Sequence, residues 1–255
     1  MTPLVSALLL LLVTLLPAMP TPAVAGAANQ CVACHRTEDL PIALGHSFAE
    51  WKASPHGRAG VGCERCHGGD ATAGVADRAH AGMKPAADPE SAVSDRHLPH
   101  TCGACHAQEE KAFEESGHGK TLAGGGKGAT CRICHGTMAT SLPSPAELDQ
   151  RCAACHQKPV EAQAALAVMT ATKRSLIRAH RAVRGLRHAA AAARTQLAGR
   201  EHDLERNYTD LVRAWHTFRP KEVLTTSRDL LRLAEALTQE AAILDRRAAP
   251  PAAKL

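Results

Sequence analysis

Residues 31–35 read Cys31-Val-Ala-Cys34-His35, and this Cys-x-x-Cys-His pattern decides how the first half of the chain can fold. The pattern returns four times, at Cys63-Glu-Arg-Cys66-His67, Cys102-Gly-Ala-Cys105-His106, Cys131-Arg-Ile-Cys134-His135 and Cys152-Ala-Ala-Cys155-His156. These five motifs contain all ten cysteines of the 255-residue chain. The chemistry of the protein must therefore use two thiols and one imidazole as a unit, five times over.

The spacing within each motif indicates covalently attached haem. Two cysteines three residues apart reach the two vinyl groups of one porphyrin, and the next histidine becomes the proximal iron ligand. Zinc sites also use Cys-x-x-Cys pairs but need no histidine directly after them, and such close pairs suit redox exchange better than structural disulfides. The motifs predict five haem c groups with five proximal ligands: His35, His67, His106, His135 and His156.

The composition of the first half is consistent with this prediction. The whole chain has only two Trp, one Tyr and three Phe, and Leu, Ile and Val are sparse before residue 156. A segment so poor in large side chains buries too little apolar surface to fold alone. We expect the porphyrins to supply the missing core.

The beginning of the chain is typical of an export signal. Residues 4–16 are almost entirely Leu, Val and Ala, which is too short for a bilayer span but right for the apolar part of a signal peptide. Ala23-Val24-Ala25 follows as a small-x-small cleavage site. We predict a signal peptide over residues 1–25 and a periplasmic or otherwise exported bacterial protein. No Lys or Arg precedes the apolar run, so an uncleaved anchor is the alternative.

The pattern of the chain divides it into two parts after the signal. Residues 26–157 hold the motifs and many Gly and Pro, which predicts a haem-packed domain with little regular structure. Residues 158–255 are rich in Ala and Arg and carry a strict seven-residue repeat, Met169, Leu176, Val183, Ala190, Leu197, Leu204 and Leu211. The repeat predicts one helix over about 159–217 in a coiled coil or hairpin, with a return helix over 221–247 that begins at Pro220. The predicted class is mostly α, ending in a long helical hairpin.

Ten of the fifteen histidines lie outside the motifs, and low-spin haems need a second axial ligand. The sequence Trp51-Lys-Ala-Ser-Pro-His56-Gly57 precedes the second motif, and Phe113-Glu-Glu-Ser-Gly-His118-Gly119 precedes the fourth. This repetition marks His56 and His118 as distal ligands. His80 is a third candidate, because it lies in a loop between the second and third motifs.

The order of these motifs resembles the multihaem group that contains pentahaem nitrite reductase, octahaem hydroxylamine oxidoreductase and their small electron-carrier relatives. The resemblance covers residues 31–135 and implies distal ligation by His56, His80 and His118. It also implies His216, which opens the last helix region in Trp215-His216-Thr217-Phe218, and His46. Relatives often dimerise through long C-terminal helices, which residues 159–247 resemble in kind.

Two departures from that group bear on function. The Cys-x-x-Cys-Lys motif of the nitrite reductases, which leaves a haem face open, does not occur in this sequence. The only tyrosine, Tyr208, lies on the apolar helical stripe, where core packing is the better interpretation than a cross-link to haem. An exported carrier between a quinol-oxidising membrane donor and a terminal reductase is therefore favoured over an enzyme. A small reductase of nitrogen or sulfur oxyanions with one open haem, and a subunit of a larger respiratory complex, are the alternatives.

Charge is distributed unevenly between the two parts. Residues 1–156 have 12 Lys and Arg against 15 Asp and Glu, whereas residues 157–255 have 18 against 10. Arg174, Arg178, Arg181, Arg184 and Arg187 form a basic band expected to contact haem propionates or an acidic partner, unless it is only a solvated face. We expect redox proteins as partners and no nucleic acid. A homodimer through the C-terminal helices is an alternative, and membrane association is expected only through a partner or an uncleaved signal.

Overall fold

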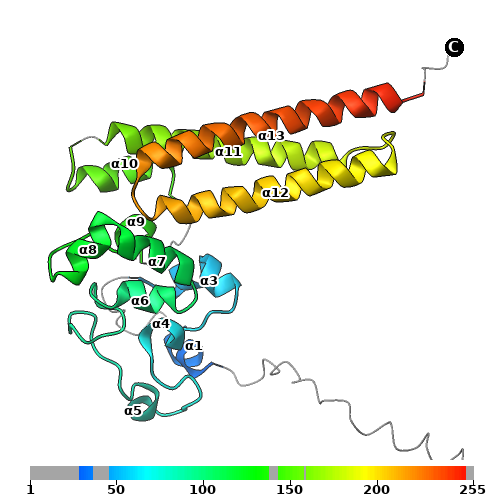
Figure 1. Cartoon of the computed structure of the whole chain (residues 1–255). Helices are drawn as coiled ribbons and strands as arrows, with labels where there is room; N and C mark the ends of the chain where they lie inside the picture. Colours follow the sequence, from blue (N-terminus) through cyan, green and yellow to red (C-terminus); the bar gives the residue numbers. More distant parts are fainter. Residues whose placement is uncertain (1–28, 37–45, 138–142, 158, 251–255) are drawn as a thin grey trace, which may run out of the picture.

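The protein is described by a computed structural model that covers residues 29–36, 46–137, 143–157 and 159–250. Within those ranges all regular secondary structure is helical, which confirms the mostly α class. Figure 1 shows a set of short helices in the N-terminal half and, above it, a bundle of long helices. The expected signal peptide lies outside the described residues.

The N-terminal half is built from short helices joined by loops. Most of them span only one or two turns, as expected for a segment rich in Gly and Pro. The helices are α1 (Gln30–His35), α2 (Phe48–Ala53), α3 (Pro55–Arg58), α4 (Glu64–His67), α5 (Ala76–Ala79), α6 (Leu98–Gly103), α7 (Ala107–Glu115), α8 (Gly117–Ala123), α9 (Cys131–His135) and α10 (Pro145–Ala153).

This half has almost no apolar core of its own. Among its described residues, the buried hydrophobic side chains are Ala73, Phe113 and Leu148. Three such side chains bury far too little area to offset the chain entropy of more than a hundred residues. The side chains supply no core here, which agrees with the expectation that porphyrins do.

The C-terminal half folds around a continuous core. Helices α11 (Val160–Arg184), α12 (Ala191–Trp215) and α13 (Pro220–Ala248) form a three-helix bundle in which each helix runs antiparallel to the one before it (Figure 1). Six of the seven repeat positions are buried in it, Met169, Leu176 and Val183 from α11 and Leu197, Leu204 and Leu211 from α12. Pro220 begins α13 as predicted, and the hydroxyl of Tyr208 donates to the carbonyl oxygen of Met169 at 3.4 Å.

The prediction of one helix over 159–217 and a two-helix hairpin was wrong. A turn at residues 185–190 separates α11 from α12, and Ala190, the remaining repeat position, is exposed there. The Asp245 carboxylate of α13 accepts hydrogen bonds from the backbone amides of Arg187 and His188, both at 2.8 Å, and so holds the turn closed. Because α11 and α12 present their stripes to one core, the spacing alone did not reveal the turn. Leu233 of α13 is 52% exposed and lies outside the core of the bundle.

Small residues bring α11 and α13 close together. Both helices carry a buried small residue at every seventh position, and all six are fully buried: Ala165, Thr172, Ala179, Ser227, Ala234 and Ala241. The Thr172 hydroxyl donates to the carbonyl oxygen of Ser227 across the seam at 3.0 Å. Without larger side chains between them, the two backbones approach closely enough for this contact. The seam therefore fixes the register of the bundle.

The two halves are in contact near the C-terminal end of α12 and the N-terminal end of α11. The Arg213 guanidinium of α12 lies 3.8 Å from the Glu109 carboxylate of α7. The Gln163 amide of α11 donates to the Asp149 carboxylate of α10. None of the described helices is long and apolar enough to cross a membrane.

Enlarging a residue of the small-residue seam should loosen the bundle. We expect Ala234→Leu to lower the free energy of unfolding by about 1–3 kcal/mol, because three extra carbon atoms do not fit between α11 and α13. The measurement is thermal unfolding followed by far-ultraviolet circular dichroism. Ala242→Leu, on the exposed face of the same helix, is the control and should leave the midpoint nearly unchanged.

Candidate functional site

Each Cys-x-x-Cys-His motif forms one turn of helix. The first, second and fourth motifs coincide with α1, α4 and α9, and the third and fifth continue from the ends of α6 and α10. The backbone amide of His67 donates to the carbonyl oxygen of Cys63 at 2.9 Å, and those of His106 and His156 make the matching bond in their motifs at 2.9 and 2.8 Å. Residues three apart on a helix lie on one side, so the two thiols of a motif face the same space. None of the ten cysteines is joined in a disulfide, and none is buried.

Every motif histidine faces a second histidine. The ring centroids are 5.8–6.1 Å apart in all five pairs. The partners are the five candidates from the sequence, in the pairs His35–His80, His67–His46, His106–His56, His135–His216 and His156–His118.

This separation fits one metal ion between the two rings. Metal–nitrogen bonds to imidazole are about 2 Å long, so two imidazoles on opposite sides of an ion have centroids about 6 Å apart. Burial, and next the charge of the facing histidine, lowers the pKa of His56, His67 and His118. These rings therefore favour the neutral form that binds metal.

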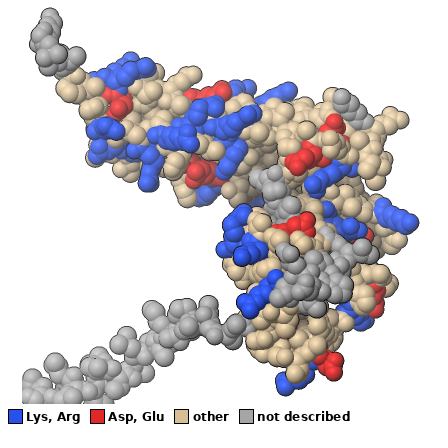
Figure 2. Space-filling view, turned by 180° about the vertical axis from the view of Figure 1, so that it is seen from behind, with Lys and Arg blue, Asp and Glu red and all other residues tan. Residues whose placement is uncertain are grey.

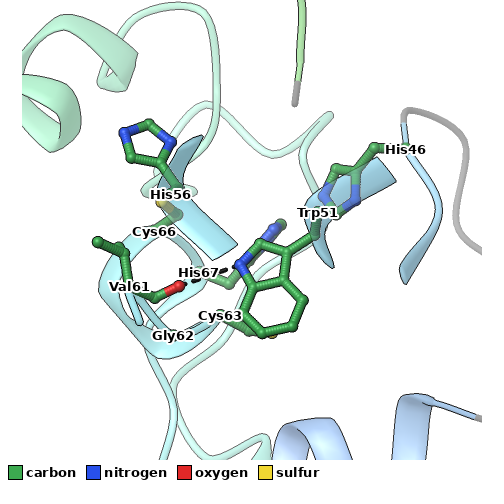
Figure 3. A pocket seen from close by; sticks show the side chains of 8 residues that line it. All are labelled: His46, Trp51, His56, Val61, Gly62, Cys63, Cys66 and His67. Carbon is green, nitrogen blue, oxygen red and sulfur yellow. Dashed lines mark hydrogen bonds between the residues drawn. The ribbon is translucent and has the colours of Figure 1, made fainter. Parts of the chain in front are cut away.

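Figure 3 shows the space around the pair His46–His67. Its lining includes the Cys63 and Cys66 thiols of the second motif, both histidines, and the Trp51 side chain. The Trp51 indole N–H donates to the carbonyl oxygen of Val61 at 3.0 Å, which turns the ring's apolar surface toward this space. Two thiols and two imidazoles are the groups that attach and ligate a covalently bound haem, and Trp51 adds an aromatic wall beside them. The residues therefore fit the group.

The repeated Ser-x-His-Gly segments have a shared local structure. The Ser116 hydroxyl donates to the carbonyl oxygen of Phe113 at 2.5 Å and accepts from the amide of Gly119 at 3.0 Å, so one side chain ends α7 and begins α8. Ser54 makes the same two bonds between α2 and α3, to Trp51 at 2.7 Å and from Gly57 at 3.0 Å. The histidine between serine and glycine is thereby set on the first turn of the second helix.

The glycine of this segment is required by a close approach. A Cβ atom on Gly119 would lie 2.2 Å from the carbonyl oxygen of Phe113, and one on Gly57 would lie 2.2 Å from that of Trp51. Either contact would force the two helices apart. The sequence showed the repetition, but only the structure gives this reason for it.

Backbone hydrogen bonds orient two of the outer histidines. His80 Nδ1 lies 3.0 Å from the carbonyl oxygen of Ala76, and His216 Nδ1 lies 3.1 Å from that of Val212. Such a bond fixes the ring of a metal-binding histidine and leaves the other nitrogen for the ion. The Nδ1 atoms of His46 and His118 are buried without a hydrogen-bond partner among the described residues.

Successive motifs of the chain are neighbours in space, because their thiols lie close enough to change one another's pKa. Burial and then the nearby Cys31 thiol raise the pKa of Cys63, and burial followed by Cys102 and Cys105 raises that of Cys66. A hydrogen bond between Cys102 and Cys131 raises the pKa of the former and lowers that of the latter.

The fourth and fifth motifs are adjacent in the same way. Burial and then Cys152 raise the pKa of Cys134. The Arg151 guanidinium of α10 donates to the carbonyl oxygens of Ile133 and Cys134, at 3.2 and 2.5 Å. The five sites therefore form a continuous row.

Three of the remaining histidines have other partners. His97 Nδ1 lies 3.2 Å from the carbonyl oxygen of Ser91, His100 Nδ1 lies 3.3 Å from the Glu110 carboxylate, and His180 Nδ1 lies 2.9 Å from that of Glu201. His188 and His202 make no ring contact with a motif histidine in the described part of the chain.

The basic band is exposed and lies far from the motifs. All five arginines are exposed, and none forms an ion pair with an acid of the described residues. Helix α11 starts beside α10 and rises about 1.5 Å per residue, so Arg174 lies about 21 Å beyond Val160. Figure 2 shows Lys and Arg gathered over the bundle. This placement favours an acidic partner over contact with propionates of the same chain.

Comparison with known proteins agrees with the motifs. The family described as cytochrome c554 and c-prime matches residues 18–68, which include the first two motifs. The C-type polyheme cytochrome OmcB of Geobacter sulfurreducens, from strains DL-1/KN400 and ATCC 51573/DSM 12127/PCA, is 38% identical over 112 residues. The match spans 42% of this chain and 13% of OmcB. No solved structure matches.

The motifs, the facing histidines and these similarities support a multihaem c-type cytochrome, a class of proteins that bind haem c covalently and transfer electrons. Sequence reasoning named the histidines that the structure brings together but missed the aromatic neighbours Trp51 and Phe218. The aromatic position of the Ser-x-His-Gly repeat was the available signal for Trp51.

A methyl group on Gly119 should disturb the fifth site. We expect Gly119→Ala to lower the thermal unfolding midpoint of the haem-loaded protein, because the Phe113 carbonyl must move. Gly117→Ala is the matched control, since a Cβ there meets nothing within 4 Å. Equal midpoints in the two variants, measured by calorimetry, would contradict the steric argument.

Proposed function

We propose that this protein is an exported pentahaem electron carrier in which all five haems have two histidine ligands. One observation carries the proposal: each of the five motif histidines has a second imidazole facing it at 5.8–6.1 Å. His46, His56, His80, His118 and His216 are the proposed distal ligands. This arrangement leaves no iron with a free coordination position.

A full ligand set suits electron transfer rather than substrate chemistry. When bound, the haems supply iron that cycles between the ferrous and ferric states, and the protein sets the potentials through ligation and burial. The chain's own residues keep two imidazoles in place at each site, and the row of motifs keeps neighbouring sites adjacent. Two imidazoles favour lower potentials than a Met–His pair.

The enzyme alternative requires an open haem. A reductase of nitrogen or sulfur oxyanions would need one five-coordinate iron, and the five pairs argue against it. Within the group that it resembles, we place the chain with the small electron carriers rather than the reductases. A role as subunit of a larger complex is compatible with the same ligands, and isolation of the native protein would distinguish it.

The proposed partners follow from the cofactor and the expected export. Haem is attached to c-type cytochromes outside the bacterial cytoplasm, so a cleaved signal over residues 1–25 and a periplasmic location belong to the proposal. A quinol-oxidising membrane protein would supply the electrons, and a terminal reductase would accept them. The C-terminal bundle is available for docking or for dimer formation.

The ligand assignment is tested by spin state. We expect the mass of the mature protein to include five haems, and its oxidised form to give only low-spin signals in electron paramagnetic resonance. His80→Ala should convert one haem in five to high spin, because its iron loses one ligand. His97→Ala is the matched control from the same interval of the chain, since its ring contacts the Ser91 carbonyl. Fewer than five haems, a high-spin signal in the unmodified protein or five low-spin haems in His80→Ala would refute the assignment.

The basic band offers a surface for an anionic redox partner. Guanidinium groups bind carboxylates in a bidentate manner, and exposed charges steer association at low salt. We expect the double variant Arg178→Glu, Arg181→Glu to slow electron exchange with an anionic partner, and the difference to shrink as ionic strength rises. Stopped-flow mixing measures the rates. Arg206→Glu and Arg232→Glu, where the arginines already pair with Asp203 and Asp229, are the controls.

A further inference from the structure

The connection between α12 and α13 contains a residue in an unfavourable backbone conformation. Phe218 has φ of 54°, and it is the only residue other than glycine with positive φ in the described part of the chain. A bulky side chain is strained in this region of backbone conformation. Surrounding contacts must hold Phe218 there, and backbone strain of this kind gathers at functional positions.

The main contact of Phe218 is with a proposed haem ligand. Its ring packs edge-to-face on His118, with centroids 4.4 Å apart and planes at 84°. The centroid of the Phe218 ring also lies 6.3 Å from that of the Trp215 ring. The α12–α13 connection therefore packs the Phe218 ring on His118, the imidazole that faces His156.

His118 needs such a contact more than His80 and His216, whose rings backbone hydrogen bonds already orient. A carbonyl oxygen of the preceding helical turn holds His80 and His216 through Nδ1. His118 Nδ1 is buried without a hydrogen-bond partner among the described residues. Packing, rather than a hydrogen bond, is left to fix the plane of this ring, and an edge-to-face aromatic contact has a defined geometry.

The same connection carries a second proposed ligand. His216 lies two residues before Phe218 and stacks opposite His135 of the fourth motif at 6.1 Å. The fourth and fifth motifs are adjacent through Cys134, Cys152 and Arg151. One short connection of the bundle thus reaches two neighbouring haem sites, one by ligation and one by packing.

We propose that Phe218 is a positioning residue that holds His118 as the distal ligand of the fifth haem. The inference rests on the proposed ligation of that haem by His118 and His156. It assigns to the bundle a direct part in the electronic properties of the fifth haem, in addition to its own stability.

The test compares variants of Phe218 in the full haem-loaded protein. We expect Phe218→Ala to shift or broaden one low-spin signal in five, or to convert it to high spin, and to allow carbon monoxide to bind to that haem after reduction. Phe218→Tyr keeps the ring and should match the unmodified protein. Phe218→Gly removes the ring and also the backbone cost, so it should behave like Phe218→Ala. Recovery of the original five signals in Phe218→Gly would show that strain, not the ring, matters and would overturn the proposal.

Two further variants separate this proposal from its premises. Leu224→Ala removes a partly buried side chain of the bundle and should lower stability without altering any haem signal. Should it change the fifth haem as Phe218→Ala does, the effect is one of general loosening and the proposal fails. His118→Ala tests the ligation itself: five low-spin haems in that variant would refute the proposed ligand. Five unchanged signals in Phe218→Ala, with one lost in His118→Ala, would refute only the role of Phe218.

Discussion

The separation of about 6 Å between facing imidazoles is the constraint on which the N-terminal half depends. Each pair joins a motif histidine to one contributed by a distant part of the chain, for example His135 of α9 and His216 after α12. A bond between two ligands and one metal ion closes such a loop more firmly than the few apolar contacts of this half. With Ala73, Phe113 and Leu148 as its buried apolar side chains, the half takes its shape from its ligands. Its loops can be long and rich in glycine because the ligands determine their ends.

The C-terminal half is stabilised by ordinary packing. Its core consists mainly of leucine and alanine side chains in register, and the small residues of α11 and α13 let those helices meet closely. The bundle folds by apolar burial, whereas the N-terminal half has too few buried apolar side chains to fold in that way. The two halves are nevertheless linked at the C-terminal end of α12, where Arg213 lies near Glu109 and His216 faces His135. Movement of α12 would therefore be transmitted to the fourth site.

The sequence allowed the site to be predicted better than the fold. Motif spacing is short-range chemistry, so the thiols and proximal histidines followed directly, and the Ser-x-His-Gly repetition pointed to His56 and His118. The pairing of each outer histidine with a motif depends on long-range folding, and it could not be obtained from spacing. The bundle was mistaken for a hairpin because its seven-residue repeat runs without interruption through the turn at 185–190. Asp245, fifty-seven residues from His188 in the sequence, holds that turn by accepting hydrogen bonds from the backbone amides of Arg187 and His188.

The arrangement gives the two ends of the proposed haem row different surroundings. The first and second sites are formed entirely by residues before 81, from short helices and loops close to the start of the described chain. The fourth and fifth sites border the bundle, where His216 and Phe218 lie on one connection. Potentials of c-type haems depend on burial and on the groups around their ligands. Sites that share a rigid bundle have less freedom to reorganise than sites held by loops, so the row has a built-in asymmetry from its first haem to its last.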